Sequence, residues 1–291
     1  MKLIDERYRL DEVDEKTALL ENILYEAVDI EKNESVYLEF VRKTDKLRRD
    51  FAVNLLDETA MISFINSPYM LKVDRIGRFS DEGEFAGDNY LNEGYYIVYE
   101  YVQAVTLAEL IHRKQLSIQD SAKIAIQVLK SLELMHGNGM YHGALKPQCI
   151  LIDDSFNVKV SGFGIVHANN GINNRSEVNL QYICPHQLIV DLTDYESDFF
   201  ALGQILFESV FKVKAFGEST VEEERLKKIN KGVSWYRLNY EVHRDNDKEL
   251  IGALKNKEFM KILKRLLSRD VGSKYSHSRN IIIDLSELIY D

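Results

Sequence analysis

Two side chains in one short stretch of the sequence, His142 and Cys149, are of types that often carry chemistry. A histidine can transfer protons near neutral pH, and an exposed thiolate is a strong nucleophile. From the residue types we expect His142 to be a packed core histidine and Cys149 an inert, partly buried thiol. A catalytic histidine and a reactive cysteine are the alternatives. The second cysteine, Cys184, is too distant from Cys149 for a Cys-x-x-Cys motif, and two cysteines make no disulfide framework.

The pattern of apolar residues predicts the elements that must position these side chains. Runs rich in β-branched and aromatic residues predict strands near 8–10, 23–28, 36–41, 71–73 and 95–99. Helical spacing from Phe51 to Ile65 predicts one helix among them. After Val102 the pattern turns helical, with a hairpin-like stretch at 149–160 and a polar loop at 169–174. The sequence therefore predicts an α+β protein with a small β-rich lobe at 1–101 and a larger helical lobe at 102–291.

The charge and the apolar content of the chain exclude several classes of partner and location. The chain has 291 residues, with 37 Lys+Arg against 47 Asp+Glu, a net charge of −10. This charge argues against nucleic acid or an anionic membrane as the main partner. The first residues lack the apolar stretch of a signal peptide, and no window holds about 18 apolar residues. We therefore expect a cytoplasmic protein with no membrane insertion.

Five motifs occur in the order and spacing of the protein kinases. The stretch 141–152, Tyr-His-Gly-Ala-Leu-Lys-Pro-Gln-Cys-Ile-Leu-Ile, resembles the kinase catalytic loop. The other four resemble the strand leading into Asp-Phe-Gly (158–164), the hinge (96–102), the Ala-Pro-Glu segment (182–188) and the helix after it (197–203). The chain thus resembles the bacterial eukaryotic-like Ser/Thr kinases of the protein kinase superfamily. This resemblance implies a two-lobed, kinase-like fold.

Several residues depart from the chemistry that the resemblance implies. Where the family has the aspartate that accepts the substrate's proton, this chain has Ala144. A methyl group accepts no proton. Cys149 and Gly162 stand where the family has its two magnesium ligands, and Glu39 replaces the phosphate-binding lysine. The glycine-rich loop is replaced by the acidic, glycine-free stretch 14–22. We therefore expect no catalytic residue, no metal and no cofactor, so that the chain is not an enzyme.

Two carboxylates could meet in the expected cleft. Glu58 matches the helix glutamate that holds the lysine in the family, and Glu39 stands where that lysine would be. If both point inward, one should protonate or turn away. The favoured interpretation is that Glu39 faces solvent or pairs with a nearby base. A metal site built from the pair is a further alternative.

The adenine pocket is expected to be filled by side chains. Tyr37 stands where the family has a small alanine above the purine, and Tyr99 occupies the gatekeeper position. Leu24 and Leu151 would be the roof and the floor. We interpret Tyr37 as a built-in replacement for adenine. The alternative is a ring turned outward from an ordinary strand.

The structural residues of the family are largely retained. Four residues match the stacked column that joins the lobes and rests on Asp198: Ile62, Val73, Phe163 and His142. The family's buried ion pair after the activation loop maps to His186 and Lys274. Both partners have changed, so that we expect this bridge to be absent or replaced.

The activation loop and the charged stretches carry weaker signals. Between Gly164 and Tyr182 there is no threonine. Gly143 replaces the catalytic-loop arginine that would bind an activating phosphate in the family. The sequence therefore does not support activation by phosphorylation. Val178-Asn179 replaces the Gly-Thr that helps bind peptide substrates. The basic run 42–49 is interpreted as a solvated helix start, with binding of an acidic partner or a phosphopeptide as the alternative.

The sequence as a whole predicts a pseudokinase. Its expected role is that of a scaffold or an allosteric regulator that binds a protein, either another kinase or a larger assembly. One alternative is an active atypical kinase that uses relocated residues. The other is a sensor whose cleft holds a small ligand other than ATP.

Overall fold

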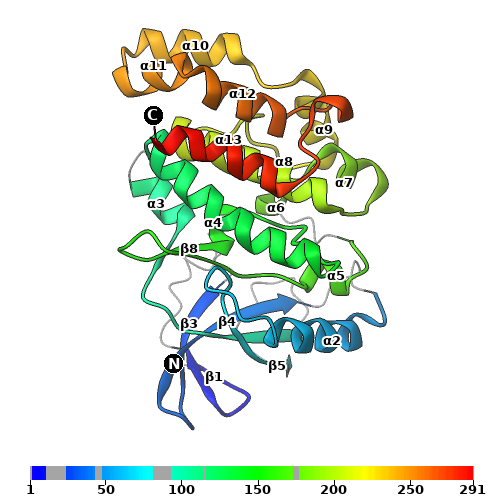
Figure 1. Cartoon of the computed structure of the whole chain (residues 1–291). Coiled ribbons are helices and arrows are strands. Elements are labelled where there is room, and N and C mark those ends of the chain that lie inside the picture. Colours follow the sequence, from blue (N-terminus) through cyan, green and yellow to red (C-terminus); the bar gives the residue numbers. More distant parts are fainter. Residues whose placement is uncertain are drawn as a thin grey trace.

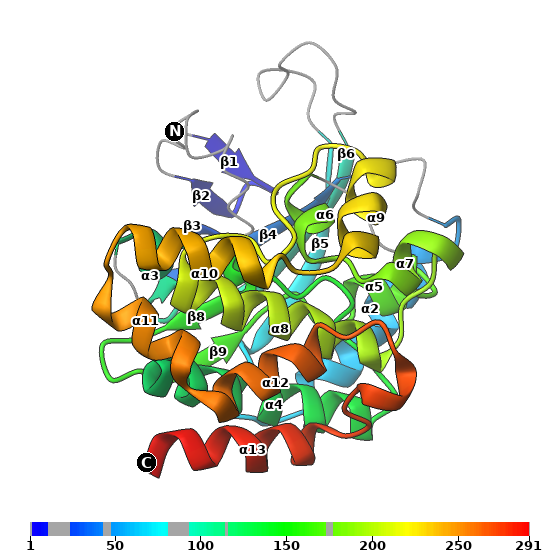
Figure 2. The same cartoon turned by 90° about the horizontal axis from the view of Figure 1, so that it is seen from above.

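The computed structural model describes residues 2–10, 24–42, 48–80, 93–113, 116–172 and 177–290. Figures 1 and 2 show two lobes, one built on a sheet with helix α2 and a larger one built of helices. The predicted α+β architecture, with a small β-rich lobe and a larger helical lobe, is confirmed. Among the described residues, no helix is long and apolar enough to cross a membrane.

The N-lobe is built on a six-stranded antiparallel sheet in the order β1-β2-β3-β4-β6-β5. Its strands are β1 (Lys2–Ile4), β2 (Tyr8–Leu10), β3 (Leu24–Asp29), β4 (Glu34–Arg42), β5 (Val73–Ser80) and β6 (Glu93–Glu100). The sequence predicted β2, β3, β4 and β6, and it placed a further strand near 71–73. The sequence analysis missed the three-residue β1. The strand expected at 71–73 instead begins at Val73.

Alternation along β4 decides which side chains face the cleft. Successive residues of a strand point to opposite faces, so Tyr37 and Glu39 share one face and Leu38 takes the other. Tyr37 packs in the large core that joins the lobes, whereas Leu38 packs in a second cluster within the N-lobe. In the sheet register Tyr37 lies opposite Tyr99 and Glu39 opposite Ile97.

Helix α2 (Phe51–Ser63) is the one long helix among the described N-lobe residues. It buries Phe51, Leu55 and Ile62, whose spacing places them on one face. In Figure 1 it lies beside α5 (Ile165–Ala168) of the C-lobe. The helix therefore connects the sheet with the helical lobe.

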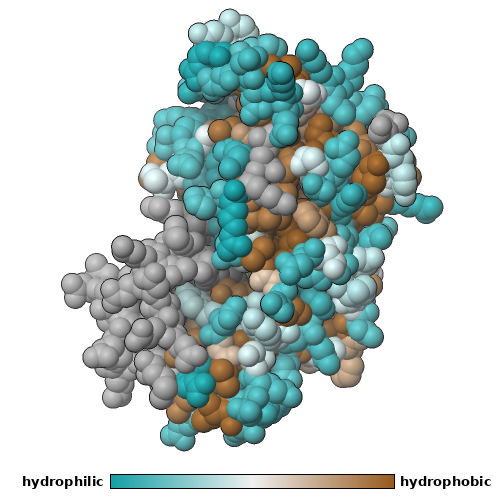
Figure 3. Space-filling view, turned by 90° about the vertical axis from the view of Figure 1, so that its left-hand side faces the viewer, coloured by the Kyte–Doolittle hydropathy of each residue, from teal (hydrophilic) through white to brown (hydrophobic). Residues whose placement is uncertain are grey.

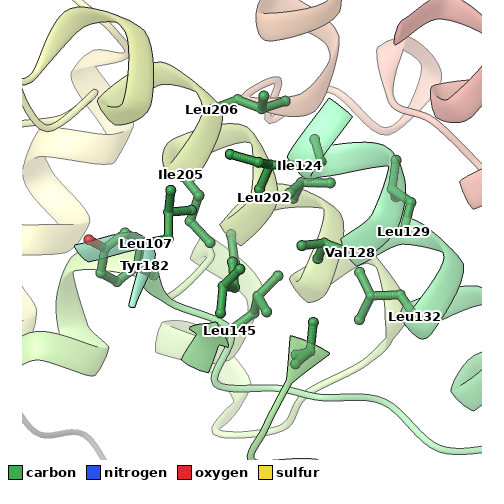
Figure 4. Packing of buried hydrophobic residues seen from close by; sticks show 14 of the residues in the cluster. Leu107, Ile124, Val128, Leu129, Leu132, Leu145, Tyr182, Leu202, Ile205 and Leu206 are labelled. Carbon is green, nitrogen blue, oxygen red and sulfur yellow. The ribbon is translucent and has the colours of Figure 1, made fainter. Parts of the chain in front are cut away.

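The C-lobe is organised around α4 (Ile118–Gly137) and α8 (Tyr195–Phe211). Ser117 caps α4 by accepting a hydrogen bond from the Asp120 amide. Figure 4 shows the packing of Ile124, Val128, Leu129 and Leu132 of α4 with Leu202, Ile205 and Leu206 of α8. Helix α8 is buried over most of its length, which is typical of a central helix.

The remaining C-lobe elements surround this pair. A three-stranded sheet contains β7 (Val105–Thr106), β8 (Ile150–Ile152) and β9 (Val158–Val160). The other helices are α3 (Leu107–Arg113), α6 (Glu177–Tyr182), α7 (Pro185–Val190), α9 (Glu222–Lys231), α10 (Trp235–Arg244), α11 (Lys248–Lys255), α12 (Lys257–Leu266) and α13 (Ser278–Tyr290). On the face in Figure 3, hydrophobic residues are exposed in several places among hydrophilic ones.

Candidate functional site

Glu39 is buried in the cleft between the lobes. Its side chain is only 5% exposed, and its Oε2 accepts a hydrogen bond of 2.7 Å from the Tyr99 hydroxyl. Burial raises the pKa of Glu39 to about 7, although the Tyr99 hydrogen bond and the charge of Lys146 oppose this. The expectation that Glu39 faces solvent is therefore wrong, and its hydrogen-bond partner is a phenol.

Glu58 has a different partner and does not pair with Glu39. Its Oε1 lies 2.7 Å from His167 Nδ1, while its Oε2 is buried without a hydrogen-bond partner. His167 belongs to α5, so this contact joins the two lobes. No group of three or more His, Cys, Asp or Glu in the described part of the chain could hold a metal ion.

The catalytic-loop positions are closely packed. Cys149 is 3% exposed, and burial raises its pKa to about 12, so the thiol stays protonated. Gly162 has φ of +84°, and a Cβ atom there would lie 3.3 Å from His142 Cε1. Ala144 donates its amide to His142 Nδ1 at 3.3 Å. These neutral groups form a tightly packed floor, and Cys149 is more deeply buried than expected.

Lys146 is the charged residue retained from the family's catalytic loop. It is 7% exposed, and its Nζ donates a hydrogen bond of 2.6 Å to Asn179 Oδ1. Asn179 stands where the family has the threonine of Gly-Thr. Lys146 also lies close enough to Glu39 for its charge to affect the pKa of that carboxyl. Among the described residues, Lys146 and Glu39 therefore bring a buried cation and a buried carboxyl into the cleft.

Tyr37 points into the cleft, and its ring is not turned outward. It is 4% exposed, its hydroxyl donates a hydrogen bond of 2.9 Å to the Val102 carbonyl, and its ring centroid lies 5.0 Å from that of Tyr101. Leu151 and Tyr99 are buried, whereas Leu24 is partly exposed and packs against the same core. All four predicted pocket residues therefore belong to one apolar cluster.

The predicted column of Ile62, Val73, Phe163 and His142 is buried throughout. The His142 and Phe163 rings lie 4.9 Å apart. Asp198 accepts hydrogen bonds from the amides of His142 and Gly143, at 2.9 and 2.8 Å. Burial lowers the pKa of His142, against the nearby charge of Asp198, and its Nε2 contacts the Ser161 carbonyl. The geometry fits a core histidine.

Asp198 has a further partner that the sequence did not indicate. His136 Nε2, at the end of α4, lies 2.9 Å from Asp198 Oδ2. In addition, His186 lies 3.9 Å from Asp194, and Lys274 lies 3.1 Å from Glu196. The two positions that form an ion pair in the family therefore have separate partners here.

Arg225 of α9 is a buried residue that the sequence analysis missed. Its guanidinium hydrogen-bonds to the carbonyls of Gly217 and Gln181 and to the side-chain amide of Gln204. Burial lowers its pKa to about 10. Its spacing of four residues from the buried Ile229 could have indicated an inward-facing position.

Some predicted features lie outside the described residues. These are the acidic stretch 14–22 at the position of the glycine-rich loop, the middle of the basic run 42–49, and residues 173–176 of the activation loop. The polar loop expected at 169–174 is therefore only partly described. Residues 165–168 and 177–182 on either side of it form helices α5 and α6.

Comparison with known families identifies the chain. The family described as "Protein kinase domain" matches residues 23–282. The chain belongs to this protein kinase family. The kinase domain is 26% identical over 277 residues to a probable serine/threonine-protein kinase of Clostridium perfringens, covering 93% of the chain and 37% of that relative. It is 29% identical over 204 residues to the serine/threonine-protein kinase PrkC of Bacillus subtilis, covering 68% of the chain and 30% of PrkC.

A solved structure agrees with this assignment at the level of the fold. The crystal structure of Rad53 1–466 in complex with AMP-PNP matches with a TM-score of 0.61 and 18% identity, covering 89% of this chain and 60% of that one. The kinase domain described here spans only about a third of the length of the bacterial relatives.

These comparisons contradict the expectation that the chain is not an enzyme. The matching family is the protein kinase domain, and the relatives are named serine/threonine-protein kinases, which points to an enzyme. Replacement of the family's catalytic residues does not by itself show that the whole chain lacks activity. Chemistry depends on the groups that converge in a site, and a fold can carry those groups at other positions.

Proposed function

We propose that this chain is a degenerate kinase domain that binds proteins, as a scaffold or an allosteric regulator of another kinase or of a larger assembly. We further propose that its cleft does not bind Mg-ATP. The observation that carries the proposal is the position of Tyr37, which is 4% exposed and hydrogen-bonded to the Val102 carbonyl. An aromatic side chain of this size buries about 150–250 Å², comparable to one face of a purine.

Contacts between the lobes support a cleft that is held in one arrangement. Asn54 of α2 donates a hydrogen bond of 2.9 Å to the Ala168 carbonyl, and the Arg48 amide donates one of the same length to Asn169. One turn further along α2, Glu58 contacts His167 of α5. These contacts attach α2 to the C-lobe without a nucleotide.

The outward side of α2 supports a role in protein binding. Val53, Leu56 and Phe64 are 62%, 55% and 88% exposed. Together with Ala60 they follow a spacing of three and four residues, which places them on the side opposite the buried face. We call these four residues the apolar stripe. A contiguous exposed apolar surface commonly marks an interaction site.

The first prediction concerns nucleotide binding. With millimolar ATP and Mg²⁺ we expect no change in the melting temperature of the full chain. A ligand at 100 times its dissociation constant would stabilise the folded state by about 2.7 kcal/mol, which is easily detected. ATP without Mg²⁺ serves as the control. A magnesium-dependent increase in melting temperature would contradict the proposed closed cleft.

The second prediction concerns the apolar stripe. The double variant Leu56→Ser/Phe64→Ser should lose proteins that the wild-type chain captures from native lysate. Its unfolding free energy should change by no more than about 0.5 kcal/mol per exposed position. The matched control is Tyr236→Ser/Tyr290→Ser, because these side chains are 84% and 89% exposed on other helices. Equal capture by wild type and both variants, measured by quantitative mass spectrometry, would exclude the stripe as the binding surface.

Phosphoryl transfer is the second candidate function, because the relatives are named kinases. Such a reaction would need charged groups other than the replaced catalytic residues of the family. Lys146 and Glu39 are two buried charged residues in the cleft that could serve. Transfer of radiolabel from ATP to a protein substrate, abolished by Lys146→Ala, would support this candidate. The same result would reject the proposal of a cleft that does not bind Mg-ATP.

A further inference from the structure

The charge of the chain is unevenly distributed. Residues 255–279 contain eight Lys or Arg and two Asp or Glu, a net charge of +6. Since the whole chain carries −10, the remaining residues carry −16. The basic segment runs from the last residue of α11 through α12 to the first two residues of α13. Figures 1 and 2 place α12 in the C-lobe between α11 and α13, on the side away from the N-lobe sheet.

This basic segment forms an open groove with a volume of about 550 Å³. Four cations line it, together with two apolar side chains and two serines. The cations are Lys257, Lys261, Lys264 and Arg265, and the apolar side chains are Leu254 and Met260. We call this feature the basic groove. It is separate from the cleft and from the apolar stripe.

The four cations are only partly neutralised by their surroundings. Lys261 pairs with Glu258 at 3.1 Å, and Arg265 pairs with Asp284 at 3.1 Å while packing on the Tyr275 ring. Lys264 lies 5.8 Å from the centroid of the Trp235 ring. Within the described part of the chain, neither Lys257 nor Lys264 pairs with a carboxylate. An exposed ion pair such as that of Lys261 contributes little and is readily exchanged.

We propose that the basic groove binds a short acidic peptide segment of a partner protein. Carboxylates of such a segment would contact Lys257 and Lys264, and an apolar residue would pack on Leu254 and Met260. Methionine adapts its shape to different apolar partners. The groove therefore offers both kinds of contact that an acidic peptide with an apolar anchor needs.

The distribution of charge favours a short peptide over an extended polyanion. The screening length is about 8 Å at physiological ionic strength, so a ligand confined to the groove responds mainly to the local positive charge. A long nucleic acid or an anionic membrane would extend beyond the groove toward other parts of the chain, and the residues outside 255–279 together carry a charge of −16. This site does not depend on the state of the cleft, so its failure would leave the proposed regulatory function untouched.

The test is fluorescence anisotropy on the full chain with a labelled peptide of alternating Glu-Glu-Leu repeats. The variant Lys257→Glu/Lys264→Glu should weaken binding by at least about tenfold. The matched control is Lys72→Glu/Lys123→Glu, which changes the net charge equally through two exposed lysines that do not line the groove. The control should stay within about twofold of wild type, because distant surface charges are screened. Binding should also weaken as salt increases.

Each outcome of the test supports or overturns the proposal. Selective loss with the groove variant supports it, and so does partial loss with Lys257→Gln/Lys264→Gln, which serves if the charge reversal impairs folding. Equal weakening by the groove variant and the control would overturn the proposal, because net charge alone would then explain binding. The proposal also fails if a single-stranded oligonucleotide or a phosphatidylserine vesicle binds at the groove and the peptide does not.

Discussion

Replacing Tyr37 by alanine is expected to lower the free energy of unfolding by about 3–5 kcal/mol, as for other truncations of buried aromatic side chains. The ring is 4% exposed and lies in the core that joins the lobes, so its removal leaves a cavity. The Val102 carbonyl also loses its hydrogen-bond donor. Urea denaturation followed by circular dichroism measures the difference. We also expect weaker capture of partners, because the lobes would lose a contact that fixes their arrangement.

Two control variants separate the contribution of the buried ring to stability from that of the hydroxyl and from that of an exposed ring. Tyr37→Phe keeps the ring and removes the hydroxyl, which should cost about 1 kcal/mol. Tyr236→Ala removes a ring that is 84% exposed and should change stability by less than about 0.5 kcal/mol. If Tyr37→Ala were as mild as Tyr236→Ala, the ring would not be buried and the filled pocket would be wrong.

Glu39→Gln is expected to stabilise the protein at pH 8 and to have little effect at pH 4.5. The pKa of Glu39 is about 7 in the folded protein against 4.5 for an unperturbed glutamate. Between these values the unfolded chain releases the proton while the folded protein keeps it, so stability falls as pH rises from 4.5 to 7. At 1.36 kcal/mol per pKa unit, the full loss above pH 7 is about 3 kcal/mol.

Glutamine preserves an acceptor for the Tyr99 hydroxyl and removes the ionisation. The stability of Glu39→Gln should therefore lack the fall with pH that wild type shows. Denaturant unfolding at several pH values measures both curves. The matched control is Glu26→Gln on the neighbouring strand β3, where the side chain is exposed and the substitution should change stability by less than about 0.5 kcal/mol. A constant difference between wild type and Glu39→Gln from pH 5 to pH 8 would show that Glu39 does not titrate as proposed.

The family and the fold were determined by the sequence alone. Motifs such as those at 141–152 and 158–164 consist of neighbouring residues, so their order and spacing can be read along the chain. Interactions between residues close in sequence also determine that Ser117 caps the start of α4. They likewise determine that Phe51, Leu55 and Ile62 lie on the buried face of α2. These features depend on periodicity and on hydrogen bonds over a few residues.

The partners of the buried polar groups were decided only by the tertiary structure. Glu39 and Tyr99 lie 60 positions apart, and Glu58 and His167 lie 109 positions apart. No local pattern links such residues, because packing of the whole domain brings them together. The sequence therefore could not show that Glu39 accepts a hydrogen bond from a phenol, or that Glu58 joins the lobes through a histidine. The same reason applies to the buried Arg225, whose partners Gln181 and Gln204 lie 44 and 21 positions away.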